Sequence, residues 1–268
     1  MIGKLFQTGT RLFLLAVVLT AMSTLWLDAH AATTTAMTAT ASESRPVEAR
    51  VTQIVVNGPV DLALHPAATP ELYVKGDPRL VSRVTTRMEG HVLYVGTRGI
   101  FISTGQSEQT RVELSLPMVE KVTLQGSGNA VIKGFKGTRL ELVLRGSGDM
   151  NAEVDYQQAV ASLMGSGDLQ LQLNQADSAD ISVMGSGDAS LRGQARTLSA
   201  KLDGSGDLNA SAMKAASVQV EVNGSGDAKV SVGDELNARL SGSGDLFAYG
   251  NPARRQIKRN GSGDVVWR

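Results

Sequence analysis

Gly146-Ser147-Gly148-Asp149 decides the fold, because this tetrad recurs at a nearly constant interval through the second half of the chain. Further Gly-Ser-Gly-Asp tetrads begin at Gly165, Gly185, Gly204, Gly224, Gly242 and Gly261, and a Gly-Ser-Gly-Asn variant begins at Gly126. Consecutive first glycines lie 20, 19, 20, 19, 20, 18 and 19 residues apart. A period this regular is typical of repeat proteins, whose units stack because none can bury its apolar face alone.

Apolar residues alternate in phase on both sides of every tetrad. The positions two and four residues before the first glycine are aliphatic, with Arg259 as the exception, and so are those four and six residues after it, apart from Trp267. This alternation predicts strands on either side of the tetrad, with both glycines at inward positions and the serine and aspartate pointing outward. Glycine allows a sharp bend or a close approach of the backbone to the opposite wall of the coil, so each tetrad is interpreted as a corner.

The predicted corner glycines are the first and third residues of all eight tetrads. They are Gly126, Gly128, Gly146, Gly148, Gly165, Gly167, Gly185, Gly187, Gly204, Gly206, Gly224, Gly226, Gly242, Gly244, Gly261 and Gly263.

The period predicts an all-β parallel β-helix, or solenoid, with about 19–20 residues per rung and about eight regular rungs. A three-residue Gly-Ser-Gly loop would instead give eight antiparallel hairpins and would keep the same apolar columns on one face. The solenoid is favoured, because identical residues at a fixed period form ladders only when coils stack.

Residues 1–31 read as a signal peptide. Lys4 and Arg11 provide a positive flank, Leu12 to Leu27 are largely apolar, and Ala29-His30-Ala31 has the form of a cleavage site. The alternative is an uncleaved membrane anchor, for which the apolar stretch is near the lower limit of length. Residues 32–46 are rich in alanine, threonine and serine and are predicted to be a flexible linker. The chain contains no cysteine, which excludes disulfides and lipid attachment at cysteine.

The remaining residues, 47–268, are predicted to form one domain. Residues 121–268 hold the tetrads, and residues 47–120 form a less regular N-terminal β segment. Within this segment, Pro78 to Met88 is predicted to be a short helix, and Thr97 to Thr110 a loop. Its expected strands, chosen by alternation and β-branched content, are Val51–Val56, Val60–Leu64, Leu72–Val74, Val92–Val95 and Val112–Leu116.

The fourth residue of each tetrad is the candidate site. In a stack, these residues would form a column about 4.8 Å apart in which like charges repel. One interpretation is that each side chain bonds the backbone of its own corner. The other is a ladder that binds cations such as calcium, or the hydroxyls of a glycan. The ladder consists of Asn129, Asp149, Asp168, Asp188, Asp207, Asp227, Asp245 and Asp264.

Charge and motifs exclude several functions. Lysine plus arginine equals aspartate plus glutamate at 26 each, with no strongly basic run, so nucleic acid is not an expected partner. The tetrads lack the lysine and the helix of a phosphate-binding loop. The three histidines are His30, in the signal segment, and His65 and His91, near strands or turns. No catalytic residue, metal site or cofactor is predicted.

The chain resembles the head GIN domain family of putative auto-transporter adhesins from about residue 47 to residue 268. The resemblance is carried by the repeated corners, by Leu116-Pro117 with Val119 and Val122-Thr123-Leu124, and by Tyr249-Gly250-Asn251-Pro252. It implies a β-helical domain exported from a bacterial cell, with adhesion as the proposed role and no catalytic residues to transfer. The Gly-Ile-Asn phrase of the family name is replaced here by Gly58-Pro59-Val60.

We therefore expect a non-catalytic, exported β-solenoid, an adhesin-like binding or structural module in the periplasm or at the cell envelope. Its expected partners are proteins or glycans there, and it is expected to meet a membrane only through the signal segment before cleavage. The alternatives are a carbohydrate-active β-helix enzyme and a calcium-dependent structural module.

Overall fold

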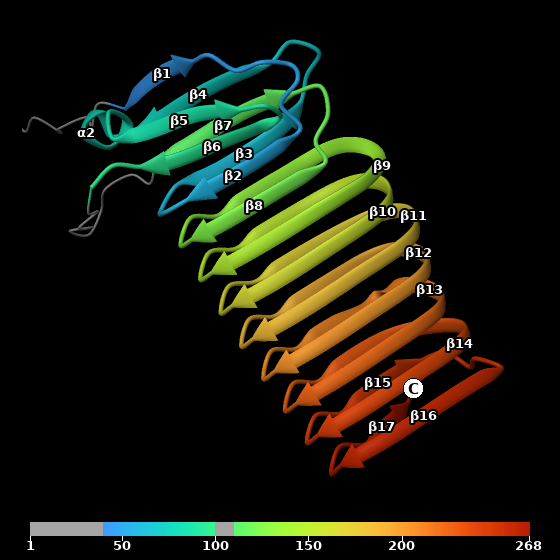
Figure 1. Ribbon diagram of the computed structural model, residues 1–268. Coiled ribbons are helices and arrows are strands. Elements are labelled where there is room, and N and C mark those ends of the chain that lie inside the picture. The colour runs from blue at the N-terminus through green and yellow to red at the C-terminus, as the bar shows by residue number, and fades with distance from the viewer. Residues whose placement is uncertain (1–39, 100–109) are drawn as a thin grey trace, which may run out of the picture. The chain divides into compact units, whose positions relative to one another are not determined.

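A computed structural model of the chain describes residues 40–99 and 110–268 and arranges them as a stack of β-rungs (Figure 1). One short helix, α2 (Pro78–Val81), accompanies the strands. The strands are β1 (Ala41–Arg45), β2 (Gln53–Asn57), β3 (Asp61–Pro66), β4 (Glu71–Gly76), β5 (Val84–Glu89), β6 (Val92–Thr97), β7 (Arg111–Leu116), β8 (Lys121–Gly126), β9 (Ala130–Gly146), β10 (Met150–Gly165), β11 (Leu169–Gly185), β12 (Ala189–Gly204), β13 (Leu208–Gly224), β14 (Ala228–Gly242), β15 (Leu246–Tyr249), β16 (Arg254–Gly261) and β17 (Val265–Trp267).

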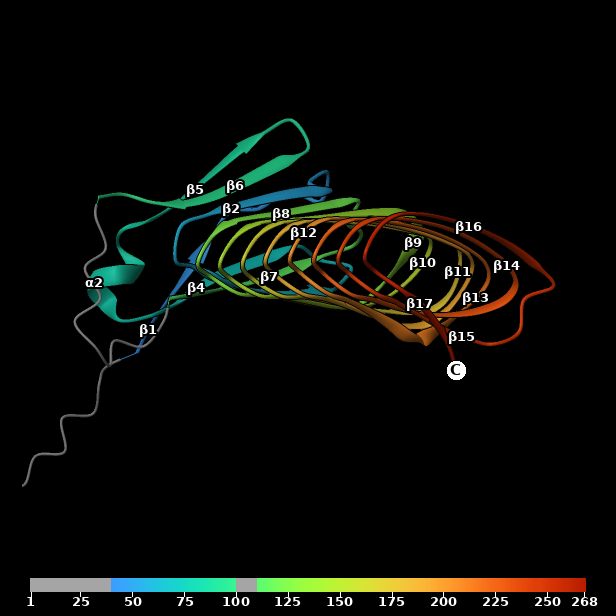
Figure 2. The same cartoon turned by 90° about the horizontal axis from the view of Figure 1, so that it is seen from below.

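The repeats form a parallel solenoid, so the predicted fold is confirmed and the hairpin alternative is wrong. Each of β9 to β14 is one long strand of 15 to 17 residues. It leaves a tetrad along one face, curves round a wide bend and returns along the other face (Figures 1 and 2). Parallel register places Gly146, Gly165 and Gly185 over one another. The eight corners enclose about seven turns, one fewer than the expected eight rungs.

Two further rungs precede the tetrads. Strands β2 and β3 pair in parallel with β8 and β9, and β6 and β7 pair in parallel with β2 and β3. The turn at Gly58 therefore lies next to the first tetrad, and a Cβ atom on Gly126 would come within 2.7 Å of the carbonyl oxygen of Gly58. The N-terminal β segment is less regular than the repeats, as predicted, and its parallel strands extend the stack.

Antiparallel strands cover the first of these rungs. Strand β4 pairs with β7, β1 pairs with β4, and β5 pairs with β6, all antiparallel. Residues 41–45 of the predicted linker form β1, because they pair with the edge of β4 despite their polar sequence. The prediction of a flexible linker is wrong for these residues. Arg45 also donates a hydrogen bond to the carbonyl oxygen of Val84 at 3.4 Å. Local sequence patterns could not predict this pairing, because the two strands are far apart in the sequence.

The predicted helix is correct only at its start. Asp77 caps α2 by accepting a hydrogen bond from the backbone N–H of Arg79 at 2.8 Å. The helix ends at Val81, and the following residues, from Val84, form β5 instead, because they pair with β6. The described residues include no helix long and apolar enough to cross a membrane. The predicted signal peptide and residues 32–39 of the predicted linker lie outside the described residues, as does most of the predicted loop.

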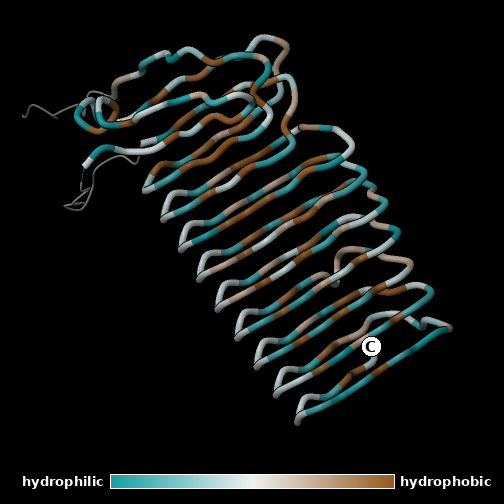
Figure 3. Tube along the Cα trace, in the orientation of Figure 1, coloured by the Kyte–Doolittle hydropathy of each residue, from teal (hydrophilic) through white to brown (hydrophobic). Residues whose placement is uncertain are grey.

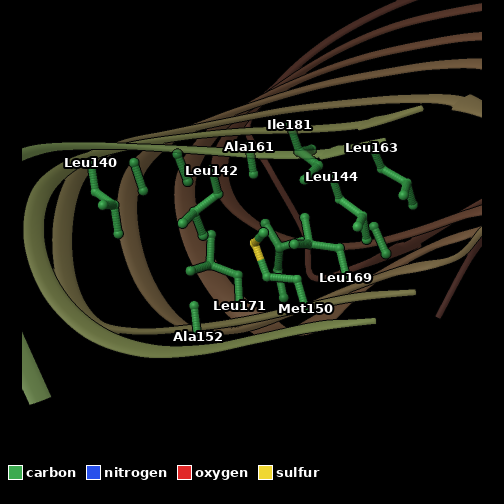
Figure 4. Close-up of a cluster of buried hydrophobic side chains, with 14 of the residues drawn as sticks. Leu140, Leu142, Leu144, Met150, Ala152, Ala161, Leu163, Leu169, Leu171 and Ile181 are labelled. Carbon is green, nitrogen blue, oxygen red and sulfur yellow. The ribbon is translucent and has the colours of Figure 1, made fainter. Parts of the chain in front are cut away.

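The hydrophobic core lies between the two faces of the coil. Hydropathy alternates along the strands, as the tube in Figure 3 shows. Leu140, Leu142 and Leu144 of one face meet Met150 and Ala152 of the other, and all five are at most 1% exposed (Figure 4). Burying each leucine side chain stabilises the fold by about 2 kcal/mol. The columns of aliphatic residues read from the sequence are therefore the wall-to-wall contacts of the solenoid.

Candidate functional site

The tetrads form one edge of the solenoid, where each corner lies directly against the next. A Cβ atom on Gly148 would lie 1.8 Å from the carbonyl oxygen of Gly128, and the third residues of later tetrads show the same close approach. The first glycines have φ between +124° and +155°, a conformation that strains other residues. Glycine is therefore required by the neighbouring corner along the stack, and not by the opposite wall of the coil.

The predicted ladder residues do form a column, and their side chains connect successive corners. In seven consecutive steps the Oδ1 atom of one residue accepts a hydrogen bond from the backbone N–H of the next at 2.8–3.2 Å. Each side chain thus bonds the following corner, and not its own corner as one interpretation expected. At the last step Arg259 donates a hydrogen bond to Asp264 at 2.8 Å.

The ladder has a ninth member that the sequence analysis missed. Asp61 accepts a hydrogen bond from the backbone N–H of Asn129 at 2.8 Å, which places it at the start of the column. The signal was present, because Ile54 and Val56 before Gly58, and Leu62 after Asp61, repeat the alternation around the tetrads. The ninth member was missed because Pro59 and Val60 stand where the tetrads have serine and glycine.

Within residues 40–99 and 110–268, no three or more histidine, aspartate or glutamate side chains gather closely enough to hold a metal ion. Two of the histidines lie at the surface near the N-terminal rungs: His65 is exposed, and His91 Nδ1 lies 2.7 Å from the carbonyl oxygen of Arg50. His30 lies outside the described residues.

A groove of about 930 Å³ runs along the wide bends, on the opposite side of the coil from the tetrads. We call it the bend groove. Five successive turns, β10 to β14, contribute to its lining. Its floor consists of Ala176, Ala195, Ala215 and Val232, which are buried. Its banks consist of Asp155, Gln157, Gln175, Asp177, Gln194, Arg196, Lys214, Ala216, Ser231, Gly233 and Asp234.

Small side chains and turns of unequal length mark the bend. Ala176, Ala195 and Ala215 pair in register on β11 to β13 and are buried in the floor of the groove. The turn between Gly224 and Gly242 is also 18 residues long, two fewer than the turn before it. The bends accordingly contain register shifts, which let turns of unequal length stack.

The polar side chains of the bend groove fall into two groups. Asp155 lies 3.6 Å from Lys136 Nζ, and Asp177 lies 2.8 Å from Arg196, so these charges are paired between turns. The amides of Gln157, Gln175 and Gln194 and the charges of Lys214 and Asp234 have no side-chain partner in the described part of the chain. All five side chains of the second group are exposed.

Tyr156 is buried between the bend-groove residues Asp155 and Gln157 in the sequence of β10. Its hydroxyl donates a hydrogen bond to the carbonyl oxygen of Val119 at 2.6 Å, which ties the β7–β8 connection to the bend. Gly137 leaves room for the ring, because a Cβ atom there would lie 2.6 Å from a ring carbon. Burial raises the pKa of Tyr156 to about 12, so the side chain stays neutral at physiological pH.

These features define a β-solenoid repeat protein with a rigid stacked edge and a polar groove. The chain belongs to the family described as "Putative auto-transporter adhesin, head GIN domain", whose model matches residues 50–252. This match confirms the family resemblance seen in the sequence. No curated protein is similar enough to count as a match.

Solved structures share the fold. A putative adhesin from Parabacteroides merdae is 22% identical, with a TM-score of 0.77 over 85% of this chain and 96% of its own. A putative lipid binding protein from Parabacteroides distasonis is also 22% identical, with a TM-score of 0.75 over 85% of this chain and 96% of its own. A putative adhesin from Bacteroides fragilis is 17% identical, with a TM-score of 0.65 over 86% of this chain and 97% of its own.

Proposed function

We propose that the protein is a non-catalytic, adhesin-like binding module, exported to the periplasm or cell envelope, which contacts a protein or glycan there through the bend groove. Family membership supports an adhesin-like role. The solenoid supplies a rigid support, since every turn from β10 to β13 is paired with neighbours on both sides.

One observation carries this proposal. The bend groove spans five turns, and its border includes Gln175, Gln194 and Lys214, whose side chains have no hydrogen-bond or ion-pair partner within the described chain. Exposed side chains on rigid strands lose little backbone entropy when they bind, because the scaffold already holds them in place. A groove of this kind is suited to recognition.

The carboxylates of the groove support binding over catalysis. Acid–base hydrolysis of a glycan uses two carboxyl groups that flank the bond to be cleaved. Asp155 and Asp177 are instead each paired with a cation on a neighbouring turn, Lys136 and Arg196. Asp234 is the remaining groove carboxylate, so the groove offers one unpaired carboxylate where such chemistry needs two.

Capture from a cell-envelope fraction tests the proposal. The full chain should retain envelope protein or glycan, and the double variant Gln175→Ala/Gln194→Ala should retain markedly less. The matched control is Gln219→Ala/Gln256→Ala, which removes two exposed glutamines outside the groove. Equal capture by both double variants would refute the groove as the binding surface. Release of reducing sugar from added glycans would instead show an enzyme.

A further inference from the structure

We infer that the bend groove binds an extended, neutral polysaccharide whose chain runs along the solenoid axis across β10 to β14. This inference rests on the proposed function and specifies its ligand. It follows from the length of the groove, from the pairing of its backbone and from the chemistry of its banks.

The groove is long and crosses the turns. Its lining residues come from five successive turns. At the spacing of hydrogen-bonded strands, about 4.8 Å, four intervals span roughly 19 Å along the axis. Two of the three free amides, Gln175 and Gln194, lie on adjacent turns, and Lys214 follows on the next. A linear polymer can meet all three positions at once, whereas a single sugar reaches only part of them.

Each turn of the groove lies between two paired turns, which disfavours a peptide strand. Peptides often bind by adding a strand to a free sheet edge. Here Gln194 pairs with Lys214, and Lys214 pairs with Ser231, in parallel register, and only short register shifts interrupt the pairing, so the groove offers no continuous strand edge. Recognition therefore falls to side chains that project from the banks.

Those side chains match hydroxyl groups. A glutamine amide both donates and accepts hydrogen bonds, as does a sugar hydroxyl. The groove lining holds three carboxylates, Asp155, Asp177 and Asp234, and two cations, Arg196 and Lys214. Lys136 on the neighbouring turn lies outside the lining but pairs with Asp155, so the charges in and beside the groove sum to zero. A site without net charge gives no long-range attraction to a strongly anionic or cationic polymer. The observations together favour a neutral, hydroxyl-rich chain.

The test measures binding of the full chain to soluble laminarin, glucomannan, arabinoxylan and dextran, and to glucose, mannose and xylose. We expect at least one polymer to bind, with affinity that rises from the monosaccharide through short oligomers and then levels off once the groove is filled. Gln175→Ala/Gln194→Ala should weaken this binding about tenfold or more, since few side chains carry most of the energy of such a contact. Gln219→Ala/Gln256→Ala should leave it unchanged.

Three results would overturn the inference: no polymer of the panel is bound, a monosaccharide is bound as tightly as its polymer, or the two double variants lose affinity equally. Envelope capture separates this failure from failure of the proposed function. If the groove variant still loses capture of an envelope protein while the wild-type chain binds no polysaccharide, the binding module stands and its ligand is a protein. If neither capture nor polysaccharide binding depends on the groove, both proposals fail.

Discussion

The Oδ1 atom of Asp61 accepts a hydrogen bond from the backbone N–H of Asn129 at 2.8 Å, across 68 residues of chain. The same contact joins Asn129 to Asp149 and continues to Asp264. Asp61 thereby fixes the N-terminal rungs in register with the repeats. The ladder is a structural device of the stacked edge that needs an acceptor at each corner, and Asn129 shows that the acceptor can be neutral.

Removal of the first side chain of the ladder should destabilise the protein more than removal of the last, because in the described chain no following corner bonds to Asp264. Asp61 is only 8% exposed, so Asp61→Ala leaves the N–H of Asn129 without an acceptor and should cost about 1–3 kcal/mol. Asp264→Ala removes an exposed acceptor whose ion pair with Arg259 is worth about 0.5 kcal/mol. Urea unfolding of both variants measures the difference. A smaller loss for Asp61→Ala would contradict the structural role of the ladder.

A single methyl group in a corner should be poorly tolerated. In Gly167→Ala the new Cβ atom would lie 1.9 Å from the carbonyl oxygen of Gly148, which belongs to the backbone and cannot rotate away. We expect a loss of about 3 kcal/mol or more. The adjacent Ser166 is exposed, so Ser166→Ala should change the free energy of unfolding by about 0.5 kcal/mol or less. Thermal unfolding in which both variants behave alike would exclude the close stacking of corners.

Tyr156 should make stability fall at alkaline pH. A tyrosine ionises near pH 10 in the unfolded chain, whereas burial raises the pKa of Tyr156 to about 12 in the folded state. Between these values the unfolded chain releases its proton first, so the free energy of unfolding falls by up to about 2–3 kcal/mol. Below pH 10 this contribution is fully present.

Tyr156→Phe isolates this effect, because all other groups titrate alike in both proteins. The variant should be about 1 kcal/mol less stable near pH 8, where it lacks the hydrogen bond to Val119. This difference should shrink or reverse between pH 10 and pH 12. Urea unfolding at pH 8, 10 and 11 provides the comparison, and a difference independent of pH would show that the phenol is not protected by burial.

Calcium should not stabilise the protein. One carboxylate oxygen of each ladder aspartate up to Asp245 is already occupied by a backbone N–H, and no metal-binding group gathers in the described residues. We therefore expect the same melting temperature with added calcium and with a chelator. A rise of several degrees in calcium would favour the cation ladder, and its loss in Asp188→Asn would locate the ion there.

The regular part of the solenoid was predictable because each of its signals is local and repeated. Leu144 and Leu163, for example, stand at the same distance from their tetrads, and the structure stacks them in one column. The Gly58 rung was harder to see, because it shares with the tetrads only its alternation and Asp61. Strand β1 was invisible to local patterns, since its polar residues gain a partner only after β4 is in place.

The bend groove was not predicted, because it arises from differences between turns and not from their common pattern. Its floor consists of Ala176, Ala195, Ala215 and Val232, which lie in the bends and are not part of the tetrad pattern. A weak signal existed in the 19-residue spacing of Gln175 and Gln194. Without the register of the bends, however, nothing showed that these side chains share one surface.

Mapping the bound surface tests the central claim most directly. The side-chain amide NMR signals of Gln175, Gln194, Gln219 and Gln256 can be followed while a soluble cell-envelope extract is added to the full chain. The proposed binding surface predicts that the signals of Gln175 and Gln194 shift and those of Gln219 and Gln256 do not. Shifts confined to the latter pair, or the absence of shifts while the extract binds, would place recognition elsewhere on the solenoid.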